Sequence, residues 1–153
     1  MYGEPSKIRE VADRLARRAE QLRAEADELH AASDGAAWSS RAADRMREQA
    51  DLRRDELRAV AREYDAAAAR VREHAAEVQR LLDLIASIER QARNLIGEAV
   101  DRVHDALSDV VHGIKDALTP GDEADRRLAE IPTPPPGHRD WLDMPDLIPG
   151  IRL

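Results

Sequence analysis

The stretch Asp34-Gly35-Ala36-Ala37-Trp38-Ser39-Ser40 separates two long segments in which apolar residues recur every seven positions. Glycine, aspartate and serine end or cap helices, so this stretch predicts a short connection between two helices. Serine at 39 or 40 is expected to cap the second helix, and Gly35 to end the first in a left-handed conformation. The first segment carries the repeat Ile8, Leu15, Leu22 and Leu29, interleaved with Ala12, Ala19 and Ala26. The second carries Ala50, Leu57, Tyr64, Val71, Val78, Ile85, Ala92 and Ala99.

A seven-residue apolar repeat gives each helix one continuous apolar stripe, and two such helices joined by a short loop pack as an antiparallel hairpin. The sequence therefore predicts an all-α fold built on a long, coiled-coil-like hairpin at residues 4–95. An amphipathic helix at 96–118 then continues the hairpin or folds back on it. Residues 119–153 form an extended, proline-rich tail. Asn94 and Gly97 are weak helix formers, so a break in the second helix is expected there if anywhere.

The two helices of this hairpin differ in length. The first begins near Pro5, where Ser6 is expected to cap it, and covers only about thirty residues of the second at 1.5 Å per residue. From about Ala75 onward the apolar stripe must be buried by a segment that folds back, by a second copy or by a partner. The candidate docking seam comprises Leu57, Tyr64, Val71, Val78, Leu82 and Ile85.

The tail offers a second candidate docking element. Pro132-Thr133-Pro134-Pro135-Pro136-Gly137 is typical of a polyproline-like spacer. The apolar residues beyond it are interrupted by prolines and are not expected to form a helix. They fit either a linear motif that docks on a partner or a strap that covers the stripe past Ala75. The candidate docking residues of the tail are Trp141, Leu142, Leu147 and Ile148.

Composition argues against several classes of function. Charged residues make up 36% of the 153 residues and aromatic residues only 3%, with a net charge of −7 and no cysteine. Nucleic acid is a disfavoured partner, because acidic residues interleave every arginine-rich stretch. No apolar run approaches the ~20 residues of a membrane span, and no cleaved signal peptide is expected.

Chemical motifs are also lacking. The sequence has no glycine-rich phosphate loop, nucleophile elbow or zinc-ligand spacing. His104 and His112 flank several aspartates, but Ser108 occupies the position four residues on, so a solvated helix face is favoured over a metal site. We expect no enzyme, no cofactor, no metal and no small-molecule substrate.

The pattern resembles a known family, the W-x-G helical-hairpin proteins of type VII secretion. The likeness is greatest to the actinobacterial domains that form the N-terminal export module of secreted toxins, and it covers residues 4–95. Two departures stand out: Ser40 replaces the family's glycine, and no aromatic residue near the end of the helical region is followed four positions later by Asp or Glu. The residues that carry the resemblance are Pro5, Val11-Ala12, Leu15, Leu22, Leu29, Trp38-Ser39-Ser40, Ala42-Ala43, Met46, Leu57, Tyr64 and Val71.

The resemblance implies a non-enzymatic substrate or export partner of a secreted toxin, with Trp38, Ser39 and Ser40 as the elbow motif. Its partners would be another helical protein or the toxin, with the secretion ATPase transiently, and a partner would supply the export signal. The protein would be secreted without a cleaved signal peptide and keep a cytoplasmic pool. Trp38 suits either a recognition surface or a plug at the end of the hairpin. Two alternatives stay open: a cytoplasmic coiled-coil scaffold, and a membrane-active protein that uses Leu95–Leu118.

Overall fold

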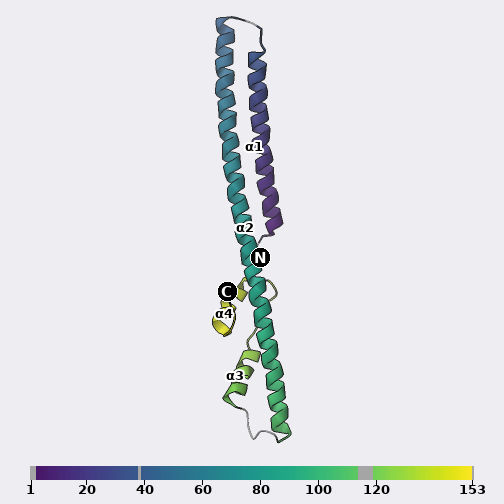
Figure 1. Cartoon of the computed structure of the whole chain (residues 1–153). Helices are drawn as coiled ribbons and strands as arrows, with labels where there is room; N and C mark the ends of the chain where they lie inside the picture. Colours follow the sequence, from purple (N-terminus) through teal and green to yellow (C-terminus); the bar gives the residue numbers. More distant parts are fainter. Residues whose placement is uncertain (1–2, 38, 114–118, 153) are drawn as a thin grey trace. The chain divides into compact units, whose positions relative to one another are not determined.

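The computed structural model describes residues 3–37, 39–113 and 119–152. Its elements are helix α1 (Pro5–Asp34), helix α2 (Arg41–Val111), helix α3 (Pro120–Ala129), the short 3-10 helix η1 (Arg139–Asp143) and helix α4 (Met144–Leu147) (Figure 1). The described residues divide into two compact units, residues 3–79 and residues 80–152. We call them the hairpin unit and the tail unit; α2 contributes its first part to one and its second part to the other.

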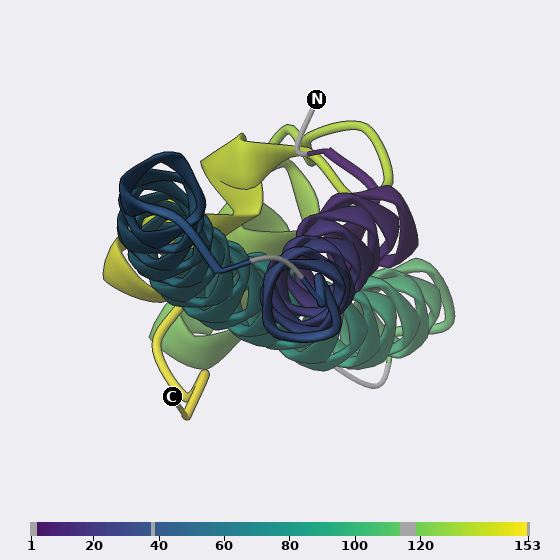
Figure 2. The ribbon, with the colours of Figure 1, turned by 90° about the horizontal axis from the view of Figure 1, so that it is seen from above.

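The hairpin unit consists of α1 packed antiparallel against the first part of α2, and Figure 2 shows the two helices as neighbouring coils. Ser40 begins α2 as predicted, because its hydroxyl accepts a 3.1 Å hydrogen bond from the backbone N–H of Ala43. The expectation of a left-handed Gly35 is wrong, since its φ is −72°. Its N–H donates to the carbonyl of Ala31 at 3.0 Å, which extends the helical hydrogen bonding by one residue.

The start of α1 also differs from the prediction. Pro5 occupies the first turn as expected, but the capping position is Glu4, which makes no side-chain cap hydrogen bond. Ser6 therefore lies inside the helix and does not cap it. Because Pro5 has no backbone N–H, one fewer N–H group at the start of α1 needs a capping partner.

Helix α2 passes through Asn94 and Gly97 without a break, so residues 96–111 continue it. Glycine inside a helix costs only about 1 kcal/mol relative to alanine. The neighbouring Ala92 and Ala99 are fully buried on one face of this region. Tertiary packing of that face therefore outweighs the weak local propensity.

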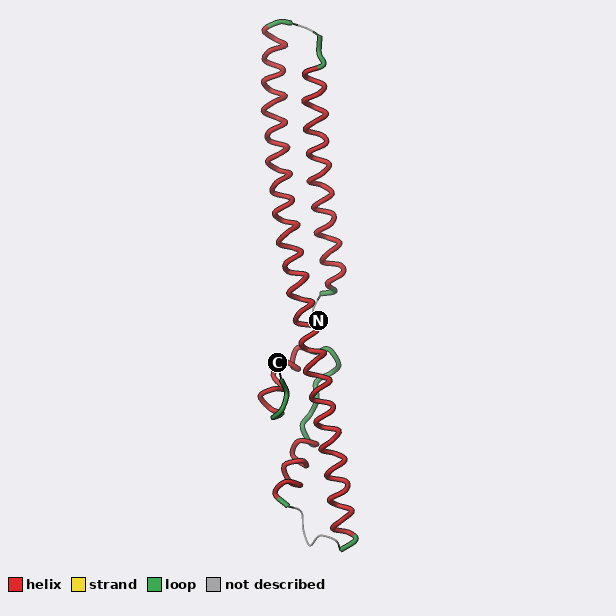
Figure 3. Tube along the Cα trace, viewed as in Figure 1, coloured by secondary structure: helices red, strands yellow, loops and turns green. Residues whose placement is uncertain are grey.

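The tail unit contains three short helical elements besides the end of α2. A loop separates α3 from η1, and α4 follows η1 directly; Figure 3 shows no strand among the described residues. Helix α3 begins with a capping box: the hydroxyl of Thr119 accepts from the N–H of Asp122, whose carboxylate accepts from the N–H of Thr119 at 2.7 Å. A pair of hydrogen bonds of 2.8 and 2.9 Å joins Arg102 of α2 to Asp125 of α3. These contacts attach α3 to α2.

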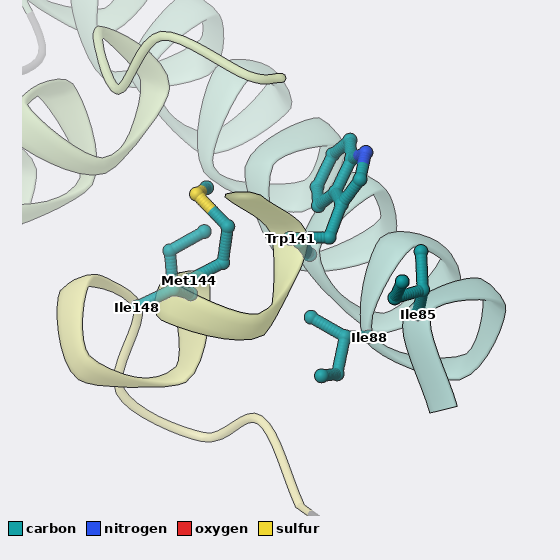
Figure 4. Packing of buried hydrophobic residues seen from close by; sticks show 6 residues of the cluster. Ile85, Ile88, Trp141, Met144 and Ile148 are labelled. Carbon is teal, nitrogen blue, oxygen red and sulfur yellow. The ribbon is translucent and has the colours of Figure 1, made fainter. Parts of the chain in front are cut away.

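The last stretch folds into η1 and α4, so the expectation that it cannot be helical is wrong. Pro145 falls in the first turn of α4, where a missing N–H has no cost. Trp141, Met144 and Ile148 of this stretch are buried against Ile85 and Ile88 of α2, as Figure 4 shows. The indole N–H of Trp141 donates to the carbonyl of Pro135 at 2.9 Å, so its one polar group is satisfied.

Polar contacts also hold the two ends of the segment 137–152 on α2. The side chain of Gln91 donates to the carbonyl of Arg152 at 3.0 Å and accepts from the N–H of Arg152 at 2.9 Å. The N–H of Gly137 donates to the carboxylate of Glu89 at 3.1 Å. The tail therefore covers the apolar stripe of α2 around Ile85–Leu95, which is the arrangement of a strap folding back.

Candidate docking surface

The contact line of the hairpin unit is made mainly of alanines. Small side chains let two helices approach closely, so most of the larger side chains lie to either side of this line of contact. Leu22 and Val78 are the larger residues buried with the alanines, at 4% and 6% exposure. The buried alanines are Ala12, Ala19 and Ala26 of α1 and Ala43, Ala50, Ala61, Ala68 and Ala75 of α2.

One flank of the hairpin is polar. On α1 most of its residues follow a contact alanine by one or four positions, and Arg9 precedes Ala12 by three. Each of these offsets turns the side chain about 40–100° to the same side of the line. Arg58 donates to Asp27 at 2.7 Å and Arg72 to Asp13 at 3.2 Å. Arg23 pairs with Asp65.

Two further polar contacts lie on this flank. Arg54 lies between Asp51, at 2.8 Å, and the ring of His30, at 3.3 Å. Arg9 adds a 3.4 Å hydrogen bond to Gln79.

The opposite flank is apolar. Leu15 and Leu29 lie three positions after Ala12 and Ala26, which turns them about 60° to the other side of the line. On α2, Tyr64 and Val71 lie three positions after Ala61 and Ala68 and are turned in the same sense. Because the helices are antiparallel, both sets fall on one side of the hairpin. The four side chains are only half-buried.

A groove of 170 Å³ confirms that the two sets meet on this flank. It is lined by Leu15 of α1 and by Glu63, Tyr64 and Ala67 of α2. Val11 and Val60 border the same flank at 38% and 40% exposure. A groove of this kind accepts an apolar side chain of a third helix, because helices pack by inserting side chains into such spaces. We call this surface the apolar flank.

The structure places some of the six residues of the predicted docking seam in accessible positions and buries the others. Leu57 and Tyr64 pack against the buried cluster of Ala19, Leu22 and Ala61 yet keep part of their surface exposed. Val71 and Leu82 are half-buried. Val78 is buried, and Ile85 lies beneath the tail at 1% exposure. The half-buried members in the hairpin unit remain accessible, while Ile85 is not.

The predicted docking residues of the tail also divide. Trp141 and Ile148 are fully buried on α2, and Leu142 packs against the same cluster. Arg93 lies over the ring of Trp141, 5.8 Å from its centroid. Leu147 is 59% exposed and lines a 310 Å³ groove with α3 residues that include Leu128.

The elbow motif is described only in part. Trp38 lies outside the described residues. Ser39 is exposed and Ser40 caps α2. On the other side of the connection, the guanidinium of Arg47 donates to the carbonyl of Ala36 at 3.0 Å, which ties the connection to α2.

The chemistry of the described residues is that of ion pairs. They hold no group of three or more His, Asp and Glu side chains arranged for a metal ion. A hydrogen bond from Arg102 lowers the pKa of Asp125, and the same bond raises the pKa of Arg102. A hydrogen bond to Asp55 likewise raises the pKa of Arg54. Each shift reflects stabilisation of the charged form. Arg102 and Asp125 are therefore fixed charges between α2 and α3, whereas Arg54 and Asp55 pair within α2.

Sequence reasoning missed the division of the hairpin into two flanks. The signal was present, because the large apolar residues keep a constant offset of three positions from the contact alanines on both helices. At the end of α2, the structure leaves Val100, Leu107 and Val111 exposed.

Comparisons with protein-family models, curated proteins and solved structures found no match to this chain. Among the described residues, no helix combines the length and apolar character needed to cross a membrane.

Proposed function

We propose that this protein is a non-enzymatic binding protein whose apolar flank docks on a helical hairpin of a partner and completes a four-helix bundle. The observation that carries the proposal is the segregation of the hairpin. Interhelical ion pairs occupy one flank, and half-buried Leu15, Leu29, Tyr64 and Val71 occupy the other. Since a two-helix unit buries only the stripe between its helices, an apolar flank favours a second pair of helices.

The setting we propose for this docking is type VII secretion, with the protein as a substrate or as the export partner of a secreted toxin. The support is the W-x-G-like pattern of residues 4–95 together with the antiparallel hairpin, which is the fold that the resemblance implies. A binding partner is part of this proposal, because the chain lacks the family's aromatic–acidic export pair.

Sedimentation velocity of the full chain, alone and mixed with helical proteins encoded by adjacent reading frames, tests the docking. We expect a complex that Val60→Asp weakens by about tenfold or more, because a charge then lies in the apolar contact. Leu52→Asp is the matched control: Leu52 is 54% exposed and lies two positions after Ala50, on the outer side of α2. A wild-type chain that stays monomeric in every mixture, or a complex indifferent to Val60→Asp, would overturn the docking proposal.

Export is tested separately. Culture supernatants of strains with and without the secretion ATPase are compared for the protein, with a cytosolic enzyme as the lysis control. We expect the protein in the supernatant only when the ATPase is present. Its presence in both, or in neither, contradicts the export role. If docking survives while export fails, the protein is a cytoplasmic scaffold.

A further inference from the structure

The segment that joins α3 to η1 is restricted by its prolines to an extended, polyproline II conformation. Each proline fixes its own φ at about −65° and holds the residue before it in the extended region. Residues 131–135 accordingly form neither helix nor turn, and none of them has a positive φ. The prolines of the segment are Pro132, Pro134, Pro135 and Pro136.

The exposure of this segment repeats every three residues, which is the period of a polyproline II helix. Ile131 and Pro134 are half-buried, and Ile131 packs against the buried cluster around Trp141. One edge of the segment therefore faces the tail unit, and its other two edges face solvent. We call the residues of these two exposed edges the proline ridge: Pro132, Thr133, Pro135 and Pro136.

Hydrogen bonds hold the proline ridge in place at both ends. At its start, the N–H of Ile131 donates to the carbonyl of Leu128 at 3.2 Å. Near its end, the carbonyl of Pro135 accepts from the indole N–H of Trp141 at 2.9 Å and from the N–H of His138 at 3.1 Å. A partner therefore meets a preformed surface, and little conformational entropy is lost when it binds.

The contacts within the tail unit do not use the exposed proline rings. Ile131 supplies an apolar contact and Pro135 a carbonyl, while the rings of Pro132 and Pro136 remain in solvent. Residues 132–137 carry no charge, so the ridge offers a partner apolar rings and no ion pair. Aromatic side chains are the groups that recognise a rigid ridge of this kind, because prolines pack against their flat faces.

We propose that the proline ridge is a docking site for a partner protein whose groove is lined by aromatic side chains, as in SH3, WW and EVH1 domains. The aromatic rings of the groove pack against Pro132 and Pro135 on one edge and against Pro136 on the next. The ridge lies in the tail unit alone, so this docking is independent of the apolar flank.

A second copy of this chain is a poorer occupant of the ridge. Trp141 is fully buried, and Tyr64 is the one other aromatic residue among those that the structure describes. The described part of the chain therefore has no pair of exposed aromatic rings that could receive the ridge.

The experiment titrates the full chain into three purified domains, one each of the SH3, WW and EVH1 classes, by isothermal titration calorimetry. We expect saturable binding by at least one of them. Pro135→Ala should weaken that binding by about tenfold or more, because it removes apolar ring area from the contact and keeps the backbone carbonyl. Pro132→Ala, on the same edge, should weaken it as well.

Pro134→Ala is the matched control, since it makes the same chemical change on the edge that faces the tail unit. It should leave the Kd nearly unchanged. The NMR resonance of the Trp141 indole N–H checks that each variant keeps the hydrogen bond to the carbonyl at position 135 and hence the fold of the tail.

Three results overturn the proposal. Absence of binding by all three domains removes the docking site. Equal losses in Pro134→Ala and Pro135→Ala assign the effect to the stiffness of the segment and not to the exposed rings. Self-association in sedimentation that Pro135→Ala abolishes assigns the ridge to a second copy. Failure of the hairpin proposal is read separately from Val60→Asp, which should leave binding of the three domains unchanged.

Discussion

The two units of this protein bury their apolar surface in opposite ways. The hairpin unit closes on small residues such as Ala12, Ala19 and Ala61 and leaves its leucines on one flank. The tail unit gathers the largest fully buried side chains of the described residues, which are Trp141, Ile85, Ile88 and Ile148. The tail thus buries the α2 stripe within its own chain, whereas the hairpin leaves an apolar surface partly exposed.

This difference separates the residues that stabilise the fold from the residues that we propose contact a partner. Buried apolar area sets the stability of the tail unit, since each large buried side chain contributes about 1.5–3 kcal/mol. Close helix approach sets the geometry of the hairpin, and the flanking leucines contribute only part of their area to folding. The two units should therefore respond differently to the same kind of substitution.

The largest expected effect is that of Trp141→Ala. Removing a fully buried indole costs about 3–5 kcal/mol and leaves a cavity between the tail and α2. Urea unfolding and hydrogen exchange of the amides at 85–92 should both report the loss. Leu147→Ala in the same segment is the control, since Leu147 is 59% exposed and its truncation should cost about 0.5 kcal/mol or less. Equal effects would contradict the packing described for the tail.

A second large effect is expected in the hairpin from a substitution that adds atoms. Ala19→Leu places a larger side chain in the contact line, where Ala19 packs against Leu22 and Ala61. Overpacking of this kind costs about 1–3 kcal/mol. Ala24→Leu on the exposed face of α1 is the matched control and should be near neutral, because both residues favour helices. A stabilising Ala19→Leu would show that the helices are not in close contact there.

Much of this architecture could be predicted from local pattern. The seven-residue repeat predicts the two helices and their antiparallel pairing, and Ser40 predicts the start of α2. These features depend on residues within a few turns of one another, so periodicity and capping suffice to find them. The all-α hairpin of the prediction is confirmed by the structure.

The covering of Ile85 and Ile88 by the tail could not be predicted in the same way. Trp141 reaches them from more than fifty positions away in the sequence. Nothing local distinguishes a tryptophan that folds back from one that docks on a partner, so both arrangements fitted the sequence. Whether the second helix continues through Gly97 was left open for a related reason, since burial of Ala92 and Ala99 is a tertiary effect.

A smaller effect is expected on the polar flank. Arg58 and Asp27 pair at 2.7 Å, but their side chains are 44% and 65% exposed. Exposed pairs of this kind contribute about 0.2–1 kcal/mol, so a double-mutant cycle of Arg58→Ala and Asp27→Ala should give a coupling energy in that range. The coupling should decrease in high salt. A coupling that is large and independent of salt would show that this flank is shielded from water.

The smallest effect is a pH dependence at the contact between α2 and α3. The hydrogen bond from Arg102 lowers the pKa of Asp125 below its ordinary value. A carboxylate with a lowered pKa in the folded state contributes its full stability above the unfolded pKa, about 3.9. That contribution is lost as the pH falls through the lower pKa of the folded state. Wild type should therefore exceed Asp125→Asn in thermal stability at neutral pH, and the difference should shrink in acid.

Direct titration of the Asp125 carboxyl by NMR distinguishes this ion pair from a merely local effect of the mutation. Arg102→Gln should return the pKa of Asp125 toward its ordinary value, because it removes the principal cause of the shift. If the pKa stays lowered in that variant, the Arg102 hydrogen bond is not the cause. The attachment of α3 to α2 would then depend on Leu128 and Ile131, which pack against the buried cluster around Trp141 and Ile88. These apolar contacts do not change with pH.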